Sequence, residues 1–248
     1  MMGVRKSIAC GAVAAALVIL VGCAGETTPV NLPDPQVYFV NASADSGNLS
    51  FLLNNDFQPP VLPYLQGSAN FRSITFIGEG NEAYDVAVAN EDRSFVYDEE
   101  VKEFPRNTDW IIAAIGQRNY QPGEELKRLR QVIFQVDRAG IGGSTNRLIV
   151  LHGFNRGTGN LTPSVNFQNP GDNPIYRIAN LGYGETSTID VASGTHTFVI
   201  KRSDGEAVYA TSTVTLNGGL WLVLLSGTEG AALPAEQPAI TFLPLTSR

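Results

Sequence analysis

Two short apolar runs, each opening on Trp and closing on Gly, constrain this chain more than any other feature. The first, residues 109–116, holds Trp110 and Gly116, and the second, residues 220–228, holds Trp221 and Gly227. A short, continuous apolar run bounded by turn residues is typical of a strand that is buried on both faces. We therefore expect each run to form an inner strand of a β-sandwich.

The chain repeats itself around these two runs. Residues 47–50 read Gly, Asn, Leu, Ser, and residues 159–162 read Gly, Asn, Leu, Thr, an offset of 112 residues. At this offset further aromatic and aliphatic positions coincide, namely Tyr64 with Tyr176, Phe71 with Tyr183, Ile77 with Ile189, Val86 with Phe198 and Tyr97 with Tyr209. The offset is 111 at the Trp runs. Two copies of one unit indicate a tandem duplication.

Each copy contains about seven short strand patterns separated by turn signals, which is typical of an immunoglobulin-like fold. The 25 Gly and 14 Pro residues supply those turns. The sequence thus predicts an all-β protein with two tandem immunoglobulin-like β-sandwich domains, residues 36–139 and 148–248. A Gly-rich linker, residues 140–147, separates them. The Cys and Trp pattern of antibody domains is absent.

The amino terminus resembles that of bacterial lipoproteins. A basic start is followed by an apolar core, residues 8–20, which suits a secretory signal and is short for a membrane span. Small residues then precede Cys23, as in a lipobox. The resemblance implies a signal peptide at residues 1–22, lipidation of Cys23 and a Pro-rich tether to residue 35. A plain secretory signal and a single transmembrane helix are the alternatives.

The lipid anchor predicts where the protein resides. About three acyl chains hold a protein durably on a membrane, since each buried methylene contributes roughly 0.8 kcal/mol. Ala24 stands where an Asp often retains lipoproteins in the inner membrane. We therefore expect a cell-envelope protein on the outer membrane, facing the periplasm or the surface. The membrane is its predicted partner through Cys23, together with an envelope protein or glycan.

Several motifs resemble a known family. They are residues 40–43 after a strand, residues 194–199, which read Gly, Thr, His, Thr, Phe, Val, and residues 213–216, which read Thr, Val, Thr, Leu. Together with residues 223–228 they resemble the bacterial family known as domain of unknown function 4397. The resemblance covers both copies and implies a secreted or lipid-anchored β-sandwich. It brings no established activity and no catalytic residues.

Charge and cysteine content narrow the possible functions. The net charge is −7, and it becomes −9 if Arg5 and Lys6 leave with the signal peptide, which argues against nucleic acid as a partner. The only cysteines, Cys10 and Cys23, precede the predicted domains, so no disulfide is expected there.

No motif predicts catalysis, a cofactor or a metal. The only histidines, His152 and His196, lie in different copies and lack ligands at metal-binding spacing. Residues 78–83 match the spacing of a dinucleotide fingerprint, but a strand pattern follows them where a helix is needed, so a hairpin turn is expected. We therefore predict no catalytic residues, no cofactor and no metal site.

Two alternatives stay open at this point. Carboxylates at Glu91, Asp92 and residues 98–100 could serve an envelope enzyme or enzyme subunit. Asp45, Asn48 and residues 54–56 are rich in side-chain oxygen and could bind calcium, although turn chemistry also explains them.

Three aromatic residues without a counterpart in the other copy define a possible binding surface. They are Phe57, Tyr120 and Phe154. Loops on a rigid scaffold commonly carry binding residues, and we expect a ligand at these positions or at the paired hairpin loops. The sequence therefore favours a non-catalytic, lipid-anchored envelope lipoprotein that binds a protein or glycan or acts as a spacer.

Overall fold

The computed structural model describes residues 32–75, 82–156, 164–205 and 207–246, and these residues are nearly all β-structure. Residues 32–248 form one compact unit. The predicted lipidation site, Cys23, lies outside the described residues, as do residues 78–81 of the predicted hairpin turn, residues 78–83. Residues 82 and 83 already belong to a strand. None of the helices in the described segments has the length and apolarity to cross a membrane.

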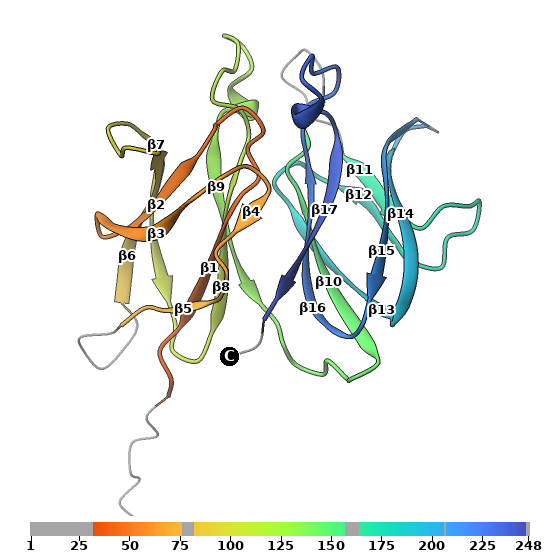
Figure 1. Cartoon of the computed structure of the whole chain (residues 1–248), viewed down its shortest axis with the longest axis horizontal. Coiled ribbons are helices and arrows are strands. Elements are labelled where there is room, and N and C mark those ends of the chain that lie inside the picture. Colours follow the sequence, from red (N-terminus) through yellow and green to blue (C-terminus); the bar gives the residue numbers. More distant parts are fainter. Residues whose placement is uncertain (1–31, 76–81, 157–163, 206, 247–248) are drawn as a thin grey trace, which may run out of the picture. The chain divides into compact units, whose positions relative to one another are not determined.

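The first half of the unit contains strands β1 to β9, which form two sheets (Figure 1). The inner sheet has the order β4-β1-β8-β9, with β5 also pairing with β1, and the outer sheet has the order β3-β2-β6-β7. The strands are β1 Gln36–Asn41, β2 Leu49–Leu53, β3 Asp56–Leu62, β4 Gln66–Gly67, β5 Arg72–Ser73, β6 Glu82–Asn90, β7 Val96–Phe104, β8 Asp109–Ile115 and β9 Arg130–Val136. A 3-10 turn, η1 Glu125–Lys127, precedes β9.

The second half repeats this arrangement with strands β10 to β17. Its inner sheet has the order β13-β10-β16-β17 and its outer sheet the order β12-β11-β14-β15. The strands are β10 Thr145–His152, β11 Val165–Gln168, β12 Arg177–Leu181, β13 Thr186–Ala192, β14 Gly194–Arg202, β15 Val208–Leu216, β16 Gly219–Ser226 and β17 Ala239–Leu245. A second 3-10 turn, η2 Pro234–Glu236, precedes β17.

The two halves also match in strand register. Strand β1 runs parallel to β8 and places Val37 opposite Trp110, while β10 runs parallel to β16 and places Leu148 opposite Trp221. Both pairs are related by an offset of 111 residues. This equivalence agrees with the predicted repeat and allows residues of one half to be compared with residues of the other.

Alternating side chains of the inner strands enter two different apolar clusters. In the first half one set, including Phe39 and Ile112, packs against the outer sheet. The other set, including Val40 and Ile111, forms a cluster shared with Leu222 and other residues of the second half. We call this shared cluster the junction. The second half has its own core, which includes Phe198.

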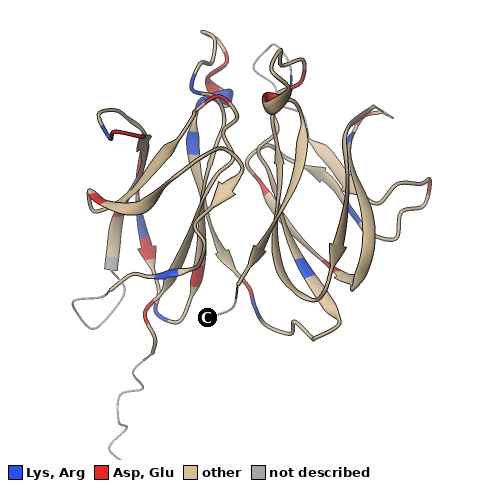
Figure 2. Ribbon diagram, in the orientation of Figure 1, with Lys and Arg blue, Asp and Glu red and all other residues tan. Residues whose placement is uncertain are grey.

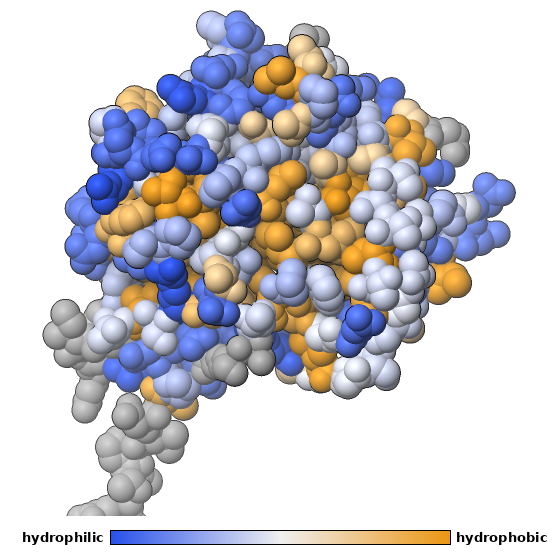
Figure 3. All heavy atoms as spheres, in the orientation of Figure 1, coloured by the Kyte–Doolittle hydropathy of each residue, from blue (hydrophilic) through white to orange (hydrophobic). Residues whose placement is uncertain are grey.

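The junction explains the apolar runs from which the sequence argument starts. Every residue of β8 is buried, because one face of the strand meets the core and the other meets the junction. Strand β16 is buried over residues 222–226, whereas Trp221 is half-buried. Charged side chains lie mainly at loops and rims of the sheets (Figure 2). An apolar area occupies the middle of the face shown in Figure 3, where strands of the two halves adjoin.

The predicted all-β sandwich architecture is confirmed, with differences in detail. The alternation of apolar and polar residues over 71–77 predicts a strand, and among the described residues only Arg72–Ser73 form one, β5. Strand β10 begins at Thr145, so the predicted linker, residues 140–147, ends inside a strand. The Pro59–Pro60 pair lies in β3, an edge strand, where a missing N–H costs no ladder bond. The immunoglobulin-like class and the two-domain division stay predictions.

Candidate functional site

The clearest hollow with aromatic walls lies at one end of the first half. Three segments line it: the β6–β7 hairpin, the loop that follows β8, and the residues before β9. We call it the hairpin groove, and its volume is about 630 Å³, within the range of small-ligand sites. Its lining residues are Asn90, Phe95, Val96, Tyr97, Gln117, Arg118, Asn119, Tyr120, Arg128 and Leu129.

The hairpin contributes two aromatic rings to the groove. Phe95 and Tyr97 flank Val96, the first residue of β7, and their rings meet edge to face at 5.2 Å. Phe95 is 60% exposed. The side chain of Asn90 fixes the turn, because its Oδ1 accepts the backbone N–H of Phe95 at 2.9 Å. The hairpin therefore holds an exposed ring, Phe95, against a half-buried one, Tyr97.

On the opposite side of the groove, a carboxylate holds the loop after β8 in place. The backbone N–H groups of Arg118 and Asn119 donate to the two carboxylate oxygens of Asp45, at 2.7 Å and 2.9 Å. Such charge-assisted hydrogen bonds are among the stronger ones in proteins. The base of the same loop is closed by backbone pairing of Gln117 with Lys127 and Leu129. Tyr120 thus projects from a loop that is tied down at two places.

The two arginines of the groove differ in their partners. The Arg128 guanidinium lies 3.5 Å from the carboxylate of Asp98, which also accepts the backbone N–H of Gln131. Within the described part of the chain, the Arg118 guanidinium has no ion pair or hydrogen bond. Arg118 is therefore a cation with all its side-chain donors available to a ligand.

In the second half, a phenylalanine of the same half packs on the tyrosine that corresponds to Tyr97. Tyr209, the counterpart of Tyr97, packs against the ring of Phe154 with 4.7 Å between ring centres. Phe154 is only 1% exposed and belongs to the core of the second half. The prediction that Phe154 belongs to a binding surface is therefore wrong, because the loop that carries it folds inward onto Tyr209. Ser43 takes the place of Phe154 in the first half and leaves Tyr97 uncovered by an equivalent ring.

The other two predicted surface aromatics lie in different surroundings. Tyr120 is half-buried and lines the hairpin groove. Phe57 is half-buried in β3 with the Arg93 guanidinium 4.8 Å from its ring centre, and it does not line the groove. The structure thus brings Tyr120 together with Phe95 and Tyr97, and it leaves Phe57 outside.

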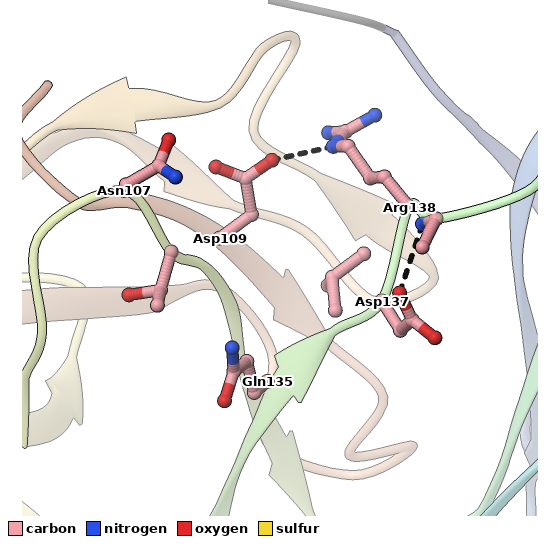
Figure 4. A pocket seen from close by; sticks show the side chains of 8 residues that line it. Asn107, Asp109, Gln135, Asp137 and Arg138 are labelled. Carbon is pink, nitrogen blue, oxygen red and sulfur yellow. Dashed lines mark hydrogen bonds and ion pairs between the residues drawn. The ribbon is translucent and has the colours of Figure 1, made fainter. Parts of the chain in front are cut away.

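A second hollow, of about 720 Å³, lies where the first half leads into the second, and carboxylates line it (Figure 4). Asp109 pairs with Arg138, whose guanidinium also lies 4.6 Å from the ring centre of Phe71. The Asp137 carboxylate accepts the N–H of Ala139 at 2.8 Å and lies 3.7 Å from Arg147. Each carboxylate thus faces an arginine, an arrangement that ties the connecting segment to both halves.

The acidic residues considered for catalysis are likewise engaged or dispersed. Asp92 accepts from the N–H and hydroxyl of Ser94, which lower the pKa of its carboxyl group. Glu91 accepts from Asn48 at 3.1 Å. Glu99 and Glu100 are exposed neighbours on β7, so they point to opposite faces. These contacts account for the acids as turn and strand residues, and the non-enzyme assignment stays a prediction.

The residues considered for calcium binding are divided between two loops. Asp45 and Asn48 precede β2, whereas residues 54–56 follow it at the other end of the strand. Asp45 is occupied by the N–H groups of Arg118 and Asn119. In the described segments, side chains of His, Cys, Asp and Glu form no group of three or more that could hold a metal.

His152 has a structural role that the repeat makes visible. Its Nδ1 accepts the backbone N–H of Phe154 at 3.3 Å, and in the first half Oδ1 of Asn41 accepts that of Ser43 at 3.0 Å. His152 is fully buried. The imidazole therefore replaces an amide that holds the turn after the first strand. His196 bonds through Nε2 to the carbonyl oxygen of Ala192 at 2.9 Å.

Comparisons with known proteins identify no family. No family model matches the chain, and no curated protein matches it. Among solved structures, the TIE protein of Bacillus anthracis is similar at 10% sequence identity and a TM-score of 0.25, over 79% of this chain and 34% of that chain. A TM-score this low does not define a shared fold. The resemblance to domain of unknown function 4397 stays a prediction.

Proposed function

We propose that this protein is a non-catalytic, lipid-anchored lipoprotein of the cell envelope whose hairpin groove binds an envelope component. The observation that carries the proposal is the groove itself, which Phe95, Tyr97, Tyr120 and Arg118 line. Aromatic side chains and arginine are the residues that most often dominate binding energy at interfaces. The rigid β scaffold beneath the groove favours binding without rearrangement.

The anchor rests on the lipobox around Cys23. Cys23→Ser removes the thiol that would be acylated, so we expect the variant to lose incorporation of labelled fatty acid. It should then leave the membrane fraction or stay unprocessed. Membrane fractionation and fatty-acid labelling of both proteins measure this. Equal labelling of wild type and variant would contradict the anchor.

Binding through the groove is tested with isolated envelopes. Phe95→Ala and Arg118→Ala should each weaken retention of the detergent-solubilised full chain by about tenfold or more, because each removes an interface anchor. Phe57→Ala and Arg93→Ala are matched controls, since they remove the same residue types outside the groove.

The controls should bind envelopes like the wild type, and all four variants should melt near the wild-type temperature. Equal retention of groove and control variants would contradict binding by this groove.

A further inference from the structure

We propose that the ligand of the hairpin groove is a neutral saccharide, a sugar ring of an envelope glycan that stacks on Phe95, Tyr97 and Tyr120 while its hydroxyls bond to the rim. The inference rests on the proposed binding function and names its substrate class. Three properties of the groove support it: an aromatic wall with one exposed ring, a polar rim and a net negative charge of the chain, which disfavours polyanions.

The repeat shows what kind of group the aromatic wall accommodates. In the second half Phe154 lies against Tyr209 at a ring separation of 4.7 Å. In the first half Ser43 replaces that ring, and the hydroxyl of Ser43 donates instead to the carbonyl oxygen of Gly116. Ser43 is fully buried and does not line the groove, so a ligand would meet Tyr97 from the groove, where the tyrosine is half-buried beside Phe95.

The counterparts of three other groove residues lack these side chains. Ala207 stands at the place of Phe95, and Ala231 at the place of Tyr120. Glu229 stands at the place of Arg118 and lies 3.6 Å from Arg156. The aromatic and cationic set is therefore specific to the first half, whereas the scaffold beneath it is common to both.

The rim requires a ligand with polar edges. Arg118 offers guanidinium donors, and Asn119 offers an amide beside the aromatic rings. A purely apolar side chain inserted here would desolvate these groups without replacing their hydrogen bonds to water, which is unfavourable. A sugar ring presents C–H groups toward the negative face of an aromatic ring and hydroxyls at its edge, so it satisfies both parts of the groove.

Charge argues against an anionic polymer. The hairpin beside the groove carries Glu91 and Asp92 together with Arg93, and the Arg128 charge is paired with Asp98. The chain as a whole has a net charge of −7. A polymer rich in phosphate or sulfate would be repelled by this net negative charge. A neutral saccharide avoids this repulsion and still uses the guanidinium as a hydrogen-bond donor.

The test is co-sedimentation of the detergent-solubilised full chain with protease-treated peptidoglycan sacculi, chitin and cellulose. We expect at least one of these glycans to retain the wild type. Phe95→Ala combined with Tyr120→Ala should reduce the bound fraction by about tenfold, because two stacking contacts are lost. Phe57→Ala should leave it unchanged. Soluble fragments of the retained glycan should compete with binding.

A parallel arm uses glycan-free envelope protein, immobilised after extraction. Retention by that protein alone, lost in the groove variants, would overturn the saccharide and leave the proposed binding function standing. If the groove variants bind like the wild type in both arms, the saccharide proposal and the proposed binding function are both overturned. Phe95 is 60% exposed, so its truncation should not impair folding, and thermal melting of each variant checks this.

Discussion

At the scale of single residues, glycine decides how each inner strand ends. Gly116 follows β8 with φ of 98°, and Gly227 follows β16 with φ of 96°. A Cβ on Gly116 would overlap the carbonyl oxygen of Arg128, and one on Gly227 would overlap that of Gln237. Both positions therefore need glycine for backbone conformation and for close approach of a second chain segment.

Gly116→Ala should consequently destabilise the fold by about 2 kcal/mol or more, since left-handed strain and a backbone clash act together. Gly123→Ala is a matched control in the same loop. Gly123 has φ of 87° but no atom within 4 Å of an added Cβ, so only the strain applies. Urea unfolding of the two variants measures the difference. Equal losses at Gly116 and Gly123 would show that the close approach contributes nothing.

At the scale of strands, burial on both faces made the inner strands predictable. The runs around Trp110 and Trp221 stand out because they are continuously apolar, and they pair with β1 and β10 in equivalent registers. Strand β4, with two residues, has no recognisable pattern, and β5 is much shorter than the alternation of residues 71–77 predicts. Their positions depend on pairing with β1 rather than on their own sequence.

The groove was harder to predict because loops assemble it. Tyr120 was identified through its lack of a counterpart, but Phe95 and Arg118 were not, since only the folded chain places the hairpin beside the loop after β8. The sequence misplaces Phe154 for the same reason. Its partner Tyr209 lies far along the chain, and contact between them is visible only in three dimensions. The exchanges between the copies, Tyr120 for Ala231 and Phe95 for Ala207, are the signals that the sequence offers for the groove.

Strand β1 also carries a titratable group into the junction. Burial raises the pKa of Tyr38 from 10.0 to about 12. Its hydroxyl therefore favours the neutral form in the folded state. The corresponding stability is present below pH 10, where the unfolded chain is neutral too, and is lost as the pH rises from 10 to about 12.

The wild type should thus lose stability more steeply over this pH range than Tyr38→Phe, which has no hydroxyl to ionise. Denaturant midpoints at a series of pH values measure the two slopes, and phenolate absorbance follows the titration. Other buried tyrosines, including Tyr183, contribute equally to both proteins. If the denaturant midpoints of the wild type and of Tyr38→Phe change equally with pH, the Tyr38 hydroxyl is in contact with solvent.

At the scale of the whole molecule, the junction couples the two halves. It buries Ile111, Ile115, Leu222 and Leu224, each fully inaccessible to solvent. Hydrogen bonds cross it as well, from the Tyr64 hydroxyl to Ser226 at 3.2 Å and from the Gln117 amide to Thr228 at 3.0 Å. A large apolar interface between two sheet pairs favours unfolding as one unit, because either half alone would expose it.

Leu216→Ala tests this coupling from a distance. Leu216 is fully buried in the core of the second half and takes no part in the junction. The substitution should cost about 2–5 kcal/mol. With Trp221→Phe as background, the fluorescence of Trp110 reports the first half alone. Its unfolding midpoint should fall together with the midpoint of the whole chain, whereas Val101→Ala, at a site 68% exposed, should leave it unchanged. An unshifted Trp110 midpoint after Leu216→Ala would mean that the halves unfold independently and that the junction adds no cooperativity.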